Sequence, residues 1–421
     1  MPTDVGIVGA GYVGLPLAVE FGRVGRTVVC FESDDRKVDA ISRGESYIED
    51  VDSAVLSELV SAGTITATAE YSGLGEPDAL LICLPTPLST NREPDLAIVT
   101  EATGQIARHL RRGQLVVLES TSYPGTTRDV LLPILESSGL VAGTDFHLAM
   151  SPERVDPGRT DYTVSTTPKV VGGFTDACRD RAIELYRSCI DTLVPVSSCE
   201  AAELAKLLEN IFRSVNIALV NELAMLCHRM DLNVWEVVEA AATKPYGFMP
   251  FSPGPGLGGH CLPIDPFYLS WKAREYDFPV EFIELAGKVN QNMPYHCAER
   301  LALALNDVQK PVSGSSVLVL GVAYKGGVGD LRESPALKVM ELLEAQGARI
   351  SYHDPFVPRL EEHGFELESQ PLTDEVLAAA DIVAVVTAHP GVDHARVAEV
   401  AQLVIDFRNA VPAANGRVVK L

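Results

Sequence analysis

The hydrophobic positions of the chain follow two alternating patterns. Short apolar runs, each ending in a loop rich in glycine, proline or small hydroxyl residues, are separated by stretches in which apolar side chains recur every three or four positions. The first pattern is typical of buried parallel strands and the second of amphipathic helices. In the first half, a strand is expected to begin at Val5, and later apolar runs occupy residues 27–31, 78–87, 114–127 and 147–158.

The second half of the chain repeats this order. Residues 315–355 predict a strand, a helix that begins near Ser334–Pro335, and a second strand that ends at Asp354. Serine followed by proline is a favourable pair for the N-cap and the first turn of a helix. Further strands are expected within 380–390 and 402–409, which correspond to the third and fourth runs of the first half.

The region between the two halves has a different character. Residues 199–241 contain no proline or glycine, and their apolar side chains recur at three- and four-residue steps. This pattern predicts a helix that bridges the two halves. Lys206 and Asn210 are four residues apart and share one face of it, beside the apolar stripe, where a polar pair faces a cleft. The alternative is a solvated lysine on an amphipathic helix.

These patterns together predict an α/β fold with two Rossmann-like doubly wound domains, joined by a long central helix in an all-α middle segment. The expected boundaries are 1–195 for the first Rossmann domain, 196–305 for the central helical domain and 312–421 for the second Rossmann-like domain.

A glycine motif follows the first strand. Gly9, Gly11 and Gly14 have G-x-G-x-x-G spacing before a helical pattern, and Glu32 ends the next strand. Such glycines permit a tight turn and close approach to a pyrophosphate, which the helix N-terminus attracts. An acidic residue at the end of the second strand accepts hydrogen bonds from ribose hydroxyls, which favours NAD over NADP. The alternative is a glycine-rich turn in an ordinary α/β domain.

Other polar residues follow the predicted strands. Thr86, Thr121 and Glu153 stand at strand ends in the first half, where ligands of doubly wound sheets bind. The second half lacks the glycine motif and offers instead Tyr324, Lys325 and Arg408. Residues of these types at strand ends are equally often solvated or act as helix caps.

Composition narrows the function classes. The chain has 421 residues and a formal net charge of −23, which argues against a general nucleic-acid binder because a phosphate backbone would be repelled. Apolar runs are too short for a membrane helix, and the start of the chain has no signal-peptide pattern, so a cytoplasmic protein is expected. The eight cysteines are scattered without a CxxC pair, which predicts neither a metal site nor disulfides.

One cysteine has unusual neighbours. Residues 253–266, PGPGLGGHCLPIDP, surround Cys261 with four glycines and four prolines. Such a loop is suited to presenting a thiol rather than burying it. In an NAD enzyme, a thiolate can add to an aldehyde to give a thiohemiacetal, whose oxidation gives a thioester that water hydrolyses to a carboxylate.

This chemistry needs further groups. Cys261 would act as the nucleophile, and Lys206 and Asn210 would hold the developing oxyanion. Glu153 and Asp265 are the candidates for the carboxylate that activates water.

The chain resembles the nucleotide-sugar 6-dehydrogenases, a family that includes UDP-glucose, GDP-mannose and UDP-N-acetylhexosamine dehydrogenases. The matching motifs run in order over essentially the whole chain: GAGYVGLP, STSYPGTT, SPERVDPG, AELAKLLEN, GPGLGGHCLPIDP, GVAYKGGVGDLRESPAL and VIDFR. The resemblance implies two successive oxidations of a sugar C6 hydroxymethyl to a uronic acid, with two NAD per turnover. It also implies that residues 312–421 bind the UDP-sugar, and that the chain forms a homodimer through the central helix.

The resemblance also implies residue roles. It assigns catalysis to Cys261, to the oxyanion pair Lys206 and Asn210, to Asp265 in proton transfer and hydrolysis, and to Glu153 and Thr121, which position or activate water. The implied cofactor contacts are Gly9, Gly11, Tyr12, Val13, Gly14, Glu32, Lys37, Thr86 and Thr121. The implied substrate contacts are Glu153, Arg154, Lys206, Asn210, Phe251, Gly258, His260, Tyr324, Lys325 and Arg408.

Two positions depart from the UDP-glucose branch. His260 and Ile264 stand where that branch has serine and lysine, and the surrounding motifs look like the branch that acts on UDP-N-acetylhexosamines. UDP-N-acetylglucosamine is the expected substrate, with UDP-N-acetylmannosamine and UDP-glucose as alternatives. His260 could act as a base, although loop geometry or contact with the acetamido group fits its place beside Cys261 better.

Two other classes share part of the pattern. A nucleotide-sugar sensor would have the same fold without turnover, and a single-step β-hydroxyacid dehydrogenase would have the glycine motif and a helical lysine and asparagine. The second class has no use for Cys261 or for the second Rossmann-like domain. Two, one or no NADH per sugar would distinguish the three.

Overall fold

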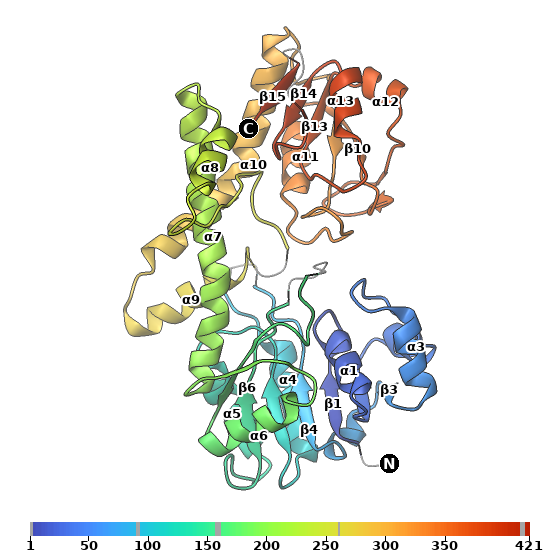
Figure 1. Cartoon of the computed structure of the whole chain (residues 1–421), viewed down its shortest axis with the longest axis vertical. Coiled ribbons are helices and arrows are strands. Elements are labelled where there is room, and N and C mark those ends of the chain that lie inside the picture. The colour runs from blue at the N-terminus through green and yellow to red at the C-terminus, as the bar shows by residue number, and fades with distance from the viewer. Residues whose placement is uncertain (1–2, 90–92, 156–160, 260–261, 413–416) are drawn as a thin grey trace. The chain divides into compact units, whose positions relative to one another are not determined.

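The computed structural model describes residues 3–89, 93–155, 161–259, 262–412 and 417–421 (Figure 1). The chain folds into two compact units, each built around one large β-sheet. The N-terminal unit comprises Met1–Glu209 and Phe267–Phe278, and the C-terminal unit comprises Asn210–Pro266 and Pro279–Leu421.

Within the described residues, the N-terminal unit contains an eight-stranded sheet with the order β3-β2-β1-β4-β5-β6-β7-β8. Its neighbouring strands pair in parallel, apart from the antiparallel pair β6 and β7. The order of the first six strands is that of a dinucleotide-binding Rossmann fold. The strands are β1 (Val5–Val8), β2 (Val28–Phe31), β3 (Ile65–Thr68), β4 (Ala79–Ile82), β5 (Leu115–Leu118), β6 (His147–Met150), β7 (Lys169–Gly173) and β8 (Leu193–Pro195).

Both faces of this sheet are covered by helices. Alternate strand residues point to opposite faces, so Ile7 packs with α1, α3 and α6 while Val8 packs with α4 and α5. Burial on both faces explains why the strands are continuous apolar runs in the sequence. The helices of this unit are α1 (Gly14–Arg23), α2 (Asp35–Ser42), α3 (Ser53–Ser61), α4 (Ala97–His109), α5 (Leu132–Glu136) and α6 (Asp176–Tyr186), with single turns η1 (Tyr71–Gly75) and η2 (Thr126–Leu131).

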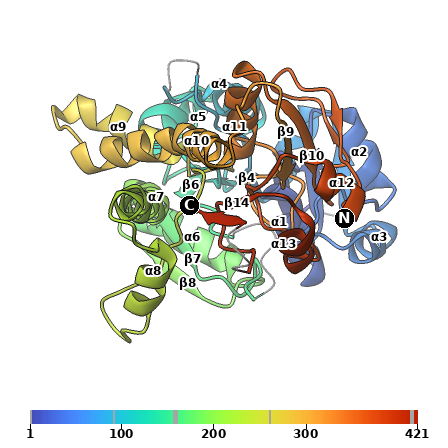
Figure 2. The same cartoon turned by 90° about the horizontal axis from the view of Figure 1, so that it is seen from above.

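The C-terminal unit contains a second parallel sheet, with the order β10-β9-β13-β14-β15 among its described strands. Helices α10 and α11 pack on one face of it, and α12 and α13 pack on the other (Figure 2). The elements are β9 (Ser316–Leu320), β10 (Arg349–His353), β13 (Ile382–Val385), β14 (Val404–Asp406), β15 (Val418–Lys420), the small antiparallel pair β11 (Arg359–Leu360) and β12 (Leu367–Glu368), α10 (Glu281–Asp307), α11 (Pro335–Ala345), α12 (Asp374–Ala379) and α13 (His394–Val400).

The start of α11 is as the sequence predicts. Ser334 is the N-cap, and its hydroxyl accepts a hydrogen bond from Ala336 N at 3.3 Å, while Pro335 opens the first turn. The two sheets and the covering helices confirm the predicted α/β fold with two Rossmann-like domains.

The helix predicted for residues 199–241, which lie between the two sheets in the sequence, is shorter than expected. Residues 199–241 form two helices, α7 (Cys199–Arg229) and α8 (Val234–Ala242), rather than one. Asp231 has a positive φ of 55°, a backbone conformation that ends the first helix. Asn233 then caps the second helix, since its side chain accepts a hydrogen bond from Trp235 N. Short polar side chains therefore break this segment without proline or glycine.

The remaining described elements of the middle segment are also helical. They are α9 (Asp265–Ala273), the single turn η3 (Arg274–Tyr276) and α10. Within the described ranges, no helix combines the length and the apolar character needed to cross a bilayer.

The apolar residues of α7 divide into two sets. Leu207 and Ile211 are buried, as the amphipathic pattern predicts. Leu204, Leu208 and Leu219 belong to the same sequence pattern but are exposed at 43%, 63% and 57%. The helix therefore has a second apolar face that the described part of the chain leaves exposed.

A buried glutamate joins α7 to the loop after β5. Glu203 is fully buried, and its carboxylate accepts hydrogen bonds from Gly125 N at 2.7 Å and from Thr127 N and Oγ1 at 2.8 and 2.7 Å. Burial raises the pKa of Glu203 to about 7, although these hydrogen bonds act in the opposite direction. The loop that carries Thr121 is thus fixed to the helix that carries Lys206.

We predict that Glu203 makes the stability of the protein depend on pH. An exposed glutamate ionises near its ordinary pKa of 4.5, whereas folded Glu203 keeps its proton to about pH 7, so the folded state binds the extra proton between these values. This group's contribution to stability is therefore full below the window and falls as pH rises through it. Glu203→Gln should lower the melting temperature by losing one acceptor, but the difference from the wild type should shrink with rising pH.

Melting temperatures of both proteins from about pH 5 to about pH 8 would measure this difference. Glu184→Gln, at an exposed glutamate of α6, is the matched control and should show a flat difference. A difference between wild type and Glu203→Gln that stays constant or grows with pH would contradict the raised pKa.

Candidate active site

The glycine motif forms the turn between β1 and α1. Gly9 has a φ of 94°, which favours glycine, and a Cβ on Gly14 would lie 2.0 Å from Gly9 O. A Cβ on Gly11 would meet nothing within 4 Å, so the surface of this turn is open. Gly11 thus leaves space for a ligand against the turn that precedes α1, and the turn fits a dinucleotide.

Glu32 lies beside this turn. Its side chain is 7% exposed, and its carboxylate accepts hydrogen bonds from Ala10 N and Asp34 N, each at 3.1 Å. Lys37 Nζ lies 3.5 Å from Glu32 Oε2. These contacts place the predicted acid next to the glycine turn, where a ribose of the dinucleotide would be held.

Neighbouring residues complete this region. Tyr12 is exposed at 47%, and Val13 packs partly against the core. Tyr47 was not among the predicted residues, yet its hydroxyl donates to Ala10 O at 2.6 Å. Burial and the charge of Glu32 raise the pKa of Tyr47, so it remains a donor. No local sequence pattern marks Tyr47, because it lies between helices α2 and α3 and acts through the fold.

Thr86 and Thr121 meet at the ends of β4 and β5. Thr86 Oγ1 donates to Thr121 O at 2.8 Å, and Ser120 Oγ accepts from Leu84 N at 3.0 Å. Tyr268 of α9 donates its hydroxyl proton to Thr86 O at 2.5 Å. The two strand ends are therefore tied together, as parallel neighbours of one sheet would allow.

Glu153 and Arg154 follow β6. Glu153 Oε1 accepts hydrogen bonds from Arg154 N and Val155 N, both at 2.6 Å. Arg154 Nη2 is 2.6 Å from Glu209 Oε1 on α7, and Nη1 donates to Pro168 O. Arg154 is therefore engaged by the protein itself and fixes the loop of Glu153 to α7.

A buried ionic cluster lies behind Glu153. Lys169 Nζ is 2.7 Å from Glu119 Oε2, and Tyr186 donates its hydroxyl proton to Glu119 Oε1. All three side chains are at most 5% exposed, and Glu119 O accepts a hydrogen bond from Glu153 N at 3.3 Å. Burial opposes the charge of Lys169, but the charges of Glu119 and Glu153 and the hydrogen bond to Glu119 together outweigh it and raise the pKa of the lysine. The sequence analysis missed this cluster, because its members come from the loop after β5, from β7 and from α6.

Lys206 and Asn210 are both buried on α7. Lys206 is 8% exposed, and its ammonium has no ion pair or hydrogen bond among the residues that the structure describes. Asn210 is 4% exposed, and its Nδ2 donates to Asp265 Oδ2 at 2.5 Å. A buried ammonium is costly without a counter-charge. Lys206 therefore has the character of a group that receives its partner from a ligand.

Arg408 is the corresponding cation of the C-terminal unit. It follows β14, and its guanidinium has no ion pair among the described side chains. Burial lowers the pKa of Arg408. A Cβ on Gly254 would lie 2.5 Å from Arg408 Nη1, so glycine at that position leaves room for the guanidinium. Lys325 lies 5.8 Å from the ring centre of Tyr324.

The loop that precedes the cysteine is held within the C-terminal unit. Asn221 Oδ1 accepts from Gly254 N at 2.9 Å, and Asn221 Nδ2 donates to Asn290 Oδ1 at 3.0 Å. The Phe251 ring packs edge-on against that of Phe212, with centroids 5.8 Å apart. Asn221 and Asn290 escaped prediction, and their only signal is an amide within a helical apolar pattern.

Not every predicted residue can be placed. Cys261 and His260 lie outside the described residues. The other predicted residues are divided between the two units. The N-terminal unit contains the glycine turn, Thr86, Thr121, Glu153 and Lys206. The C-terminal unit contains Asn210, Phe251, Gly258, Asp265, Tyr324, Lys325 and Arg408.

Comparison with known families covers most of the chain. Residues 3–190 match the NAD binding domain of the UDP-glucose/GDP-mannose dehydrogenase family. Residues 200–292 match the central domain of the same family, and residues 318–413 match its UDP binding domain.

Individual relatives agree with this result. The chain is 36% identical over 388 residues to a UDP-N-acetyl-D-mannosamine dehydrogenase of Pyrococcus horikoshii. This alignment covers 92% of the present chain and 89% of the relative. It is 37% identical over 355 residues to a UDP-N-acetyl-D-glucosamine 6-dehydrogenase of Pseudomonas aeruginosa, with 84% and 83% covered. The solved structure of a UDP-D-ManNAc dehydrogenase from Pyrococcus horikoshii is similar with a TM-score of 0.90 and 33% identity, over 99% of this chain and 98% of that one. The chain therefore belongs to the UDP-glucose/GDP-mannose dehydrogenase family, and it is an NAD-dependent nucleotide-sugar dehydrogenase.

Proposed function

We propose that the protein oxidises the C6 hydroxymethyl group of a UDP-N-acetylhexosamine, most readily UDP-N-acetylglucosamine, to the uronic acid in two steps. The observation that carries this proposal is the buried ammonium of Lys206, which has no partner among the described residues and lies one helical turn from the Asn210–Asp265 pair. A positive charge and an amide on one face of α7 suit an oxygen that becomes negative during reaction.

The glycine turn and Glu32 would hold the cofactor. When bound, NAD accepts two electrons and a proton from the sugar carbon in each oxidation. Gly11 leaves the turn open to the pyrophosphate, Gly9 and Gly14 allow the tight turn and its close packing, and Glu32 would face the ribose. A 2′-phosphate would approach the Glu32 carboxylate, which supports NAD rather than NADP.

The remaining catalytic roles are assigned to side chains of the protein. Cys261 adds as thiolate to the aldehyde to give a thiohemiacetal. The second oxidation removes a hydride from this carbon and leaves the thioester, which water hydrolyses to the carboxylate with release of the thiol. Lys206 and Asn210 stabilise the oxyanion in both stages, and Asp265 orients Asn210 and assists proton transfer. Glu153, held by the amides of its own loop, activates the water together with Thr121.

The UDP part of the substrate is assigned to the C-terminal unit. Arg408 supplies a guanidinium without an ion pair among the described residues, and Lys325 supplies a second cation, both at loops that follow sheet strands. Guanidinium and ammonium groups form strong, charge-assisted hydrogen bonds to the oxygens of a diphosphate. We propose the division 1–195 for NAD, 196–305 for the central helices and the cysteine loop, and 312–421 for the UDP-sugar.

The sugar is proposed from the residues beside the thiol. Ile264 removes the charge and length of the lysine found in the UDP-glucose branch, and His260 offers a hydrogen-bonding neighbour for an amide. An apolar side chain with a polar partner suits a 2-acetamido group. Relatives named for UDP-N-acetyl-D-glucosamine and for UDP-N-acetyl-D-mannosamine are similarly identical to this chain. Motif details near Glu153 and Phe251 favour the former.

A homodimer through α7 is also proposed. Its uncovered apolar face is formed by Leu204, Leu208, Phe212, Leu219, Leu223, Leu226 and Met230, each at least 36% exposed. Their steps of three, four and seven residues place them along one side of the helix. A second copy of the same helix would bury this face, as isologous dimers do.

The substrate proposal predicts a kinetic preference. UDP-N-acetylglucosamine should exceed UDP-glucose by at least about tenfold in kcat/KM, because a site that pairs an amide leaves a polar group unpaired with glucose. UDP-N-acetylmannosamine should be the nearest competitor. Steady-state NADH production with the three sugars at one NAD concentration would measure this, with UDP alone as the blank.

Stoichiometry tests the reaction itself. Two NADH should form per sugar consumed. One NADH would indicate a single-step dehydrogenase, and none with any sugar would indicate a sensor. A clear preference for UDP-glucose would refute the acetamido assignment.

Cys261→Ser should lower kcat for acid formation by at least about 10³-fold, because serine cannot replace the readily formed thioester. Cys189→Ala removes a thiol in the N-terminal unit, outside the proposed site, and should retain wild-type turnover. Iodoacetamide should inactivate the wild type, and saturating substrate should protect it. Full activity of Cys261→Ser would exclude thioester chemistry.

The dimer proposal predicts a change in mass. Leu219→Glu places a charge in the centre of the apolar face of α7 and should shift the protein from dimer to monomer in light-scattering measurements. Glu239→Lys alters an exposed polar position of α8, outside this face, and should leave the mass unchanged. A monomeric wild type, or a dimeric Leu219→Glu variant, would rule out this interface.

A further inference from the structure

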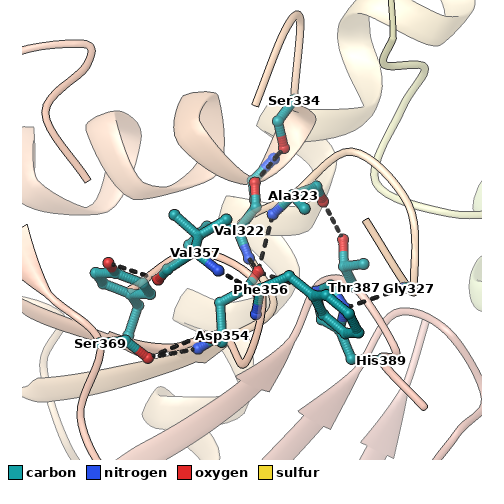
Figure 3. A network of polar contacts seen from close by, with 12 residues as sticks. Val322, Ala323, Gly327, Ser334, Asp354, Phe356, Val357, Ser369, Thr387 and His389 are labelled. Carbon is teal, nitrogen blue, oxygen red and sulfur yellow. Dashed lines mark hydrogen bonds and ion pairs between the residues drawn. The ribbon is translucent and has the colours of Figure 1, made fainter. Parts of the chain in front are cut away.

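A saturated carboxylate lies at the centre of the C-terminal unit. Asp354, which follows β10, is 1% exposed (Figure 3). Its Oδ2 accepts hydrogen bonds from Val322 N at 2.8 Å and Ala323 N at 3.1 Å, in the loop after β9. Its Oδ1 accepts from Phe356 N and Val357 N at 2.9 and 3.1 Å. Burial acts to raise the pKa of Asp354, but a hydrogen bond from His389 and these backbone amides outweigh it and hold the pKa below its usual value, so the carboxylate stays ionised.

His389 supplies the fifth donor to this carboxylate. It is 3% exposed, and its Nε2 lies 2.9 Å from Asp354 Oδ2. Its Nδ1 accepts a hydrogen bond from Gly327 N at 3.2 Å. Since Nδ1 accepts, the ring proton is on Nε2, and the neutral imidazole bridges the carboxylate to the amide of Gly327 (Figure 3).

This bridge fixes one particular loop. Residues 322–327 are held at their start by Asp354 and at their end by His389. Thr387 Oγ1 adds a bond to Ala323 O at 2.7 Å. Between these anchors lie Tyr324 and Lys325, which are proposed to contact the UDP part of the substrate.

The same loop contacts the segment before the cysteine. A Cβ on Gly258 would lie 2.6 Å from Tyr324 Cβ, and one on Gly259 would lie 2.9 Å from Tyr324 Cε2. Gly259, with a φ of 82°, also donates its amide proton to Arg332 O at 2.9 Å. The backbone of Gly258 and Gly259 is therefore packed directly on the Tyr324 side chain.

We propose that His389 is a positioning residue for the reaction: its neutral imidazole fixes the 322–327 loop, and this loop sets the place of Tyr324 and Lys325 for the UDP part and of Gly258–Gly259 for the cysteine loop. His389 acts through Gly327 and touches no reacting group. The inference rests on the proposed function for the roles of Tyr324 and Lys325, but the anchoring of the loop is independent of it.

Substitutions of His389 by asparagine and by glutamine should each keep one of its two hydrogen bonds and remove the other. Asparagine places its Oδ1 near the position of Nδ1 and can still accept from Gly327 N, whereas glutamine places its amide nitrogen near Nε2 and can still donate to Asp354. The loop is anchored by the first bond. His389→Gln should therefore release the loop, and His389→Asn should largely retain it. Thr387→Val removes the neighbouring anchor and should act in the same direction as His389→Gln.

Hydrogen–deuterium exchange of the full chain without ligand tests the anchoring. Exchange across 322–327 and at Gly258–Gly259 should accelerate in His389→Gln, by at least about fivefold, and much less in His389→Asn. Exchange in the N-terminal unit should not change in either variant. His363→Gln, at an exposed histidine of the same unit, is the matched control and should resemble the wild type.

Binding of UDP alone tests the functional consequence. The Kd for UDP should rise at least about fivefold in His389→Gln and in Thr387→Val, while the Kd for NAD stays at its wild-type value. Equal exchange in the asparagine and glutamine variants, or faster exchange throughout the unit, would overturn the proposal. Unchanged UDP affinity despite a released loop would overturn its functional part. A protein that shows these effects but oxidises no UDP-sugar would refute the proposed function and leave the positioning role intact.

Discussion

A carboxylate at the end of the second strand holds the loop that follows the first strand in both sheets. Glu32 accepts from Ala10 N in the N-terminal unit, and Asp354 accepts from two loop amides in the C-terminal unit. Among described residues, Glu32 accepts two hydrogen bonds and Asp354 five, counting that from His389. A carboxylate has about four lone-pair sites, so Glu32 can still accept bonds from a ribose whereas Asp354 is saturated. The same kind of carboxylate–amide contact therefore leaves room for a ligand in the N-terminal unit and holds a loop rigidly in the C-terminal unit.

Helix α7 carries the other constraint. Glu203, Lys206 and Asn210 are spaced by three and four residues, so the helix keeps their side chains on one face. All three are buried, but they differ in what they contact: Glu203 binds the loop after β5, Asn210 binds Asp265, and Lys206 has no charged partner among the described residues. Because the two neighbours of Lys206 on this face are fixed by the protein, the proposed role of its ammonium as an oxyanion partner is compatible with the packing of α7.

Local patterns predicted much of the fold and of the candidate site. Strand periodicity, the spacing of Gly9, Gly11 and Gly14, and the Ser334 cap each depend on a few consecutive residues, and the structure agrees with them. The same reasoning treated residues 199–241 as one helix, which is broken by the left-handed conformation of Asp231. The ion pair of Arg154 with Glu209 was also not predicted, and the role of Arg154 as a substrate contact stays a prediction.

By itself, the sequence determined the α/β class, the dinucleotide turn and the position of the polar residues at strand ends, since each follows from periodicity or spacing within one element. The tertiary structure decided which polar groups pair. Lys169 with Glu119 and His389 with Asp354 are separated by 50 and 35 residues and come from different elements. No local pattern encodes such pairs, because a buried charge is satisfied by whichever donor or acceptor the packing of the sheets brings within reach.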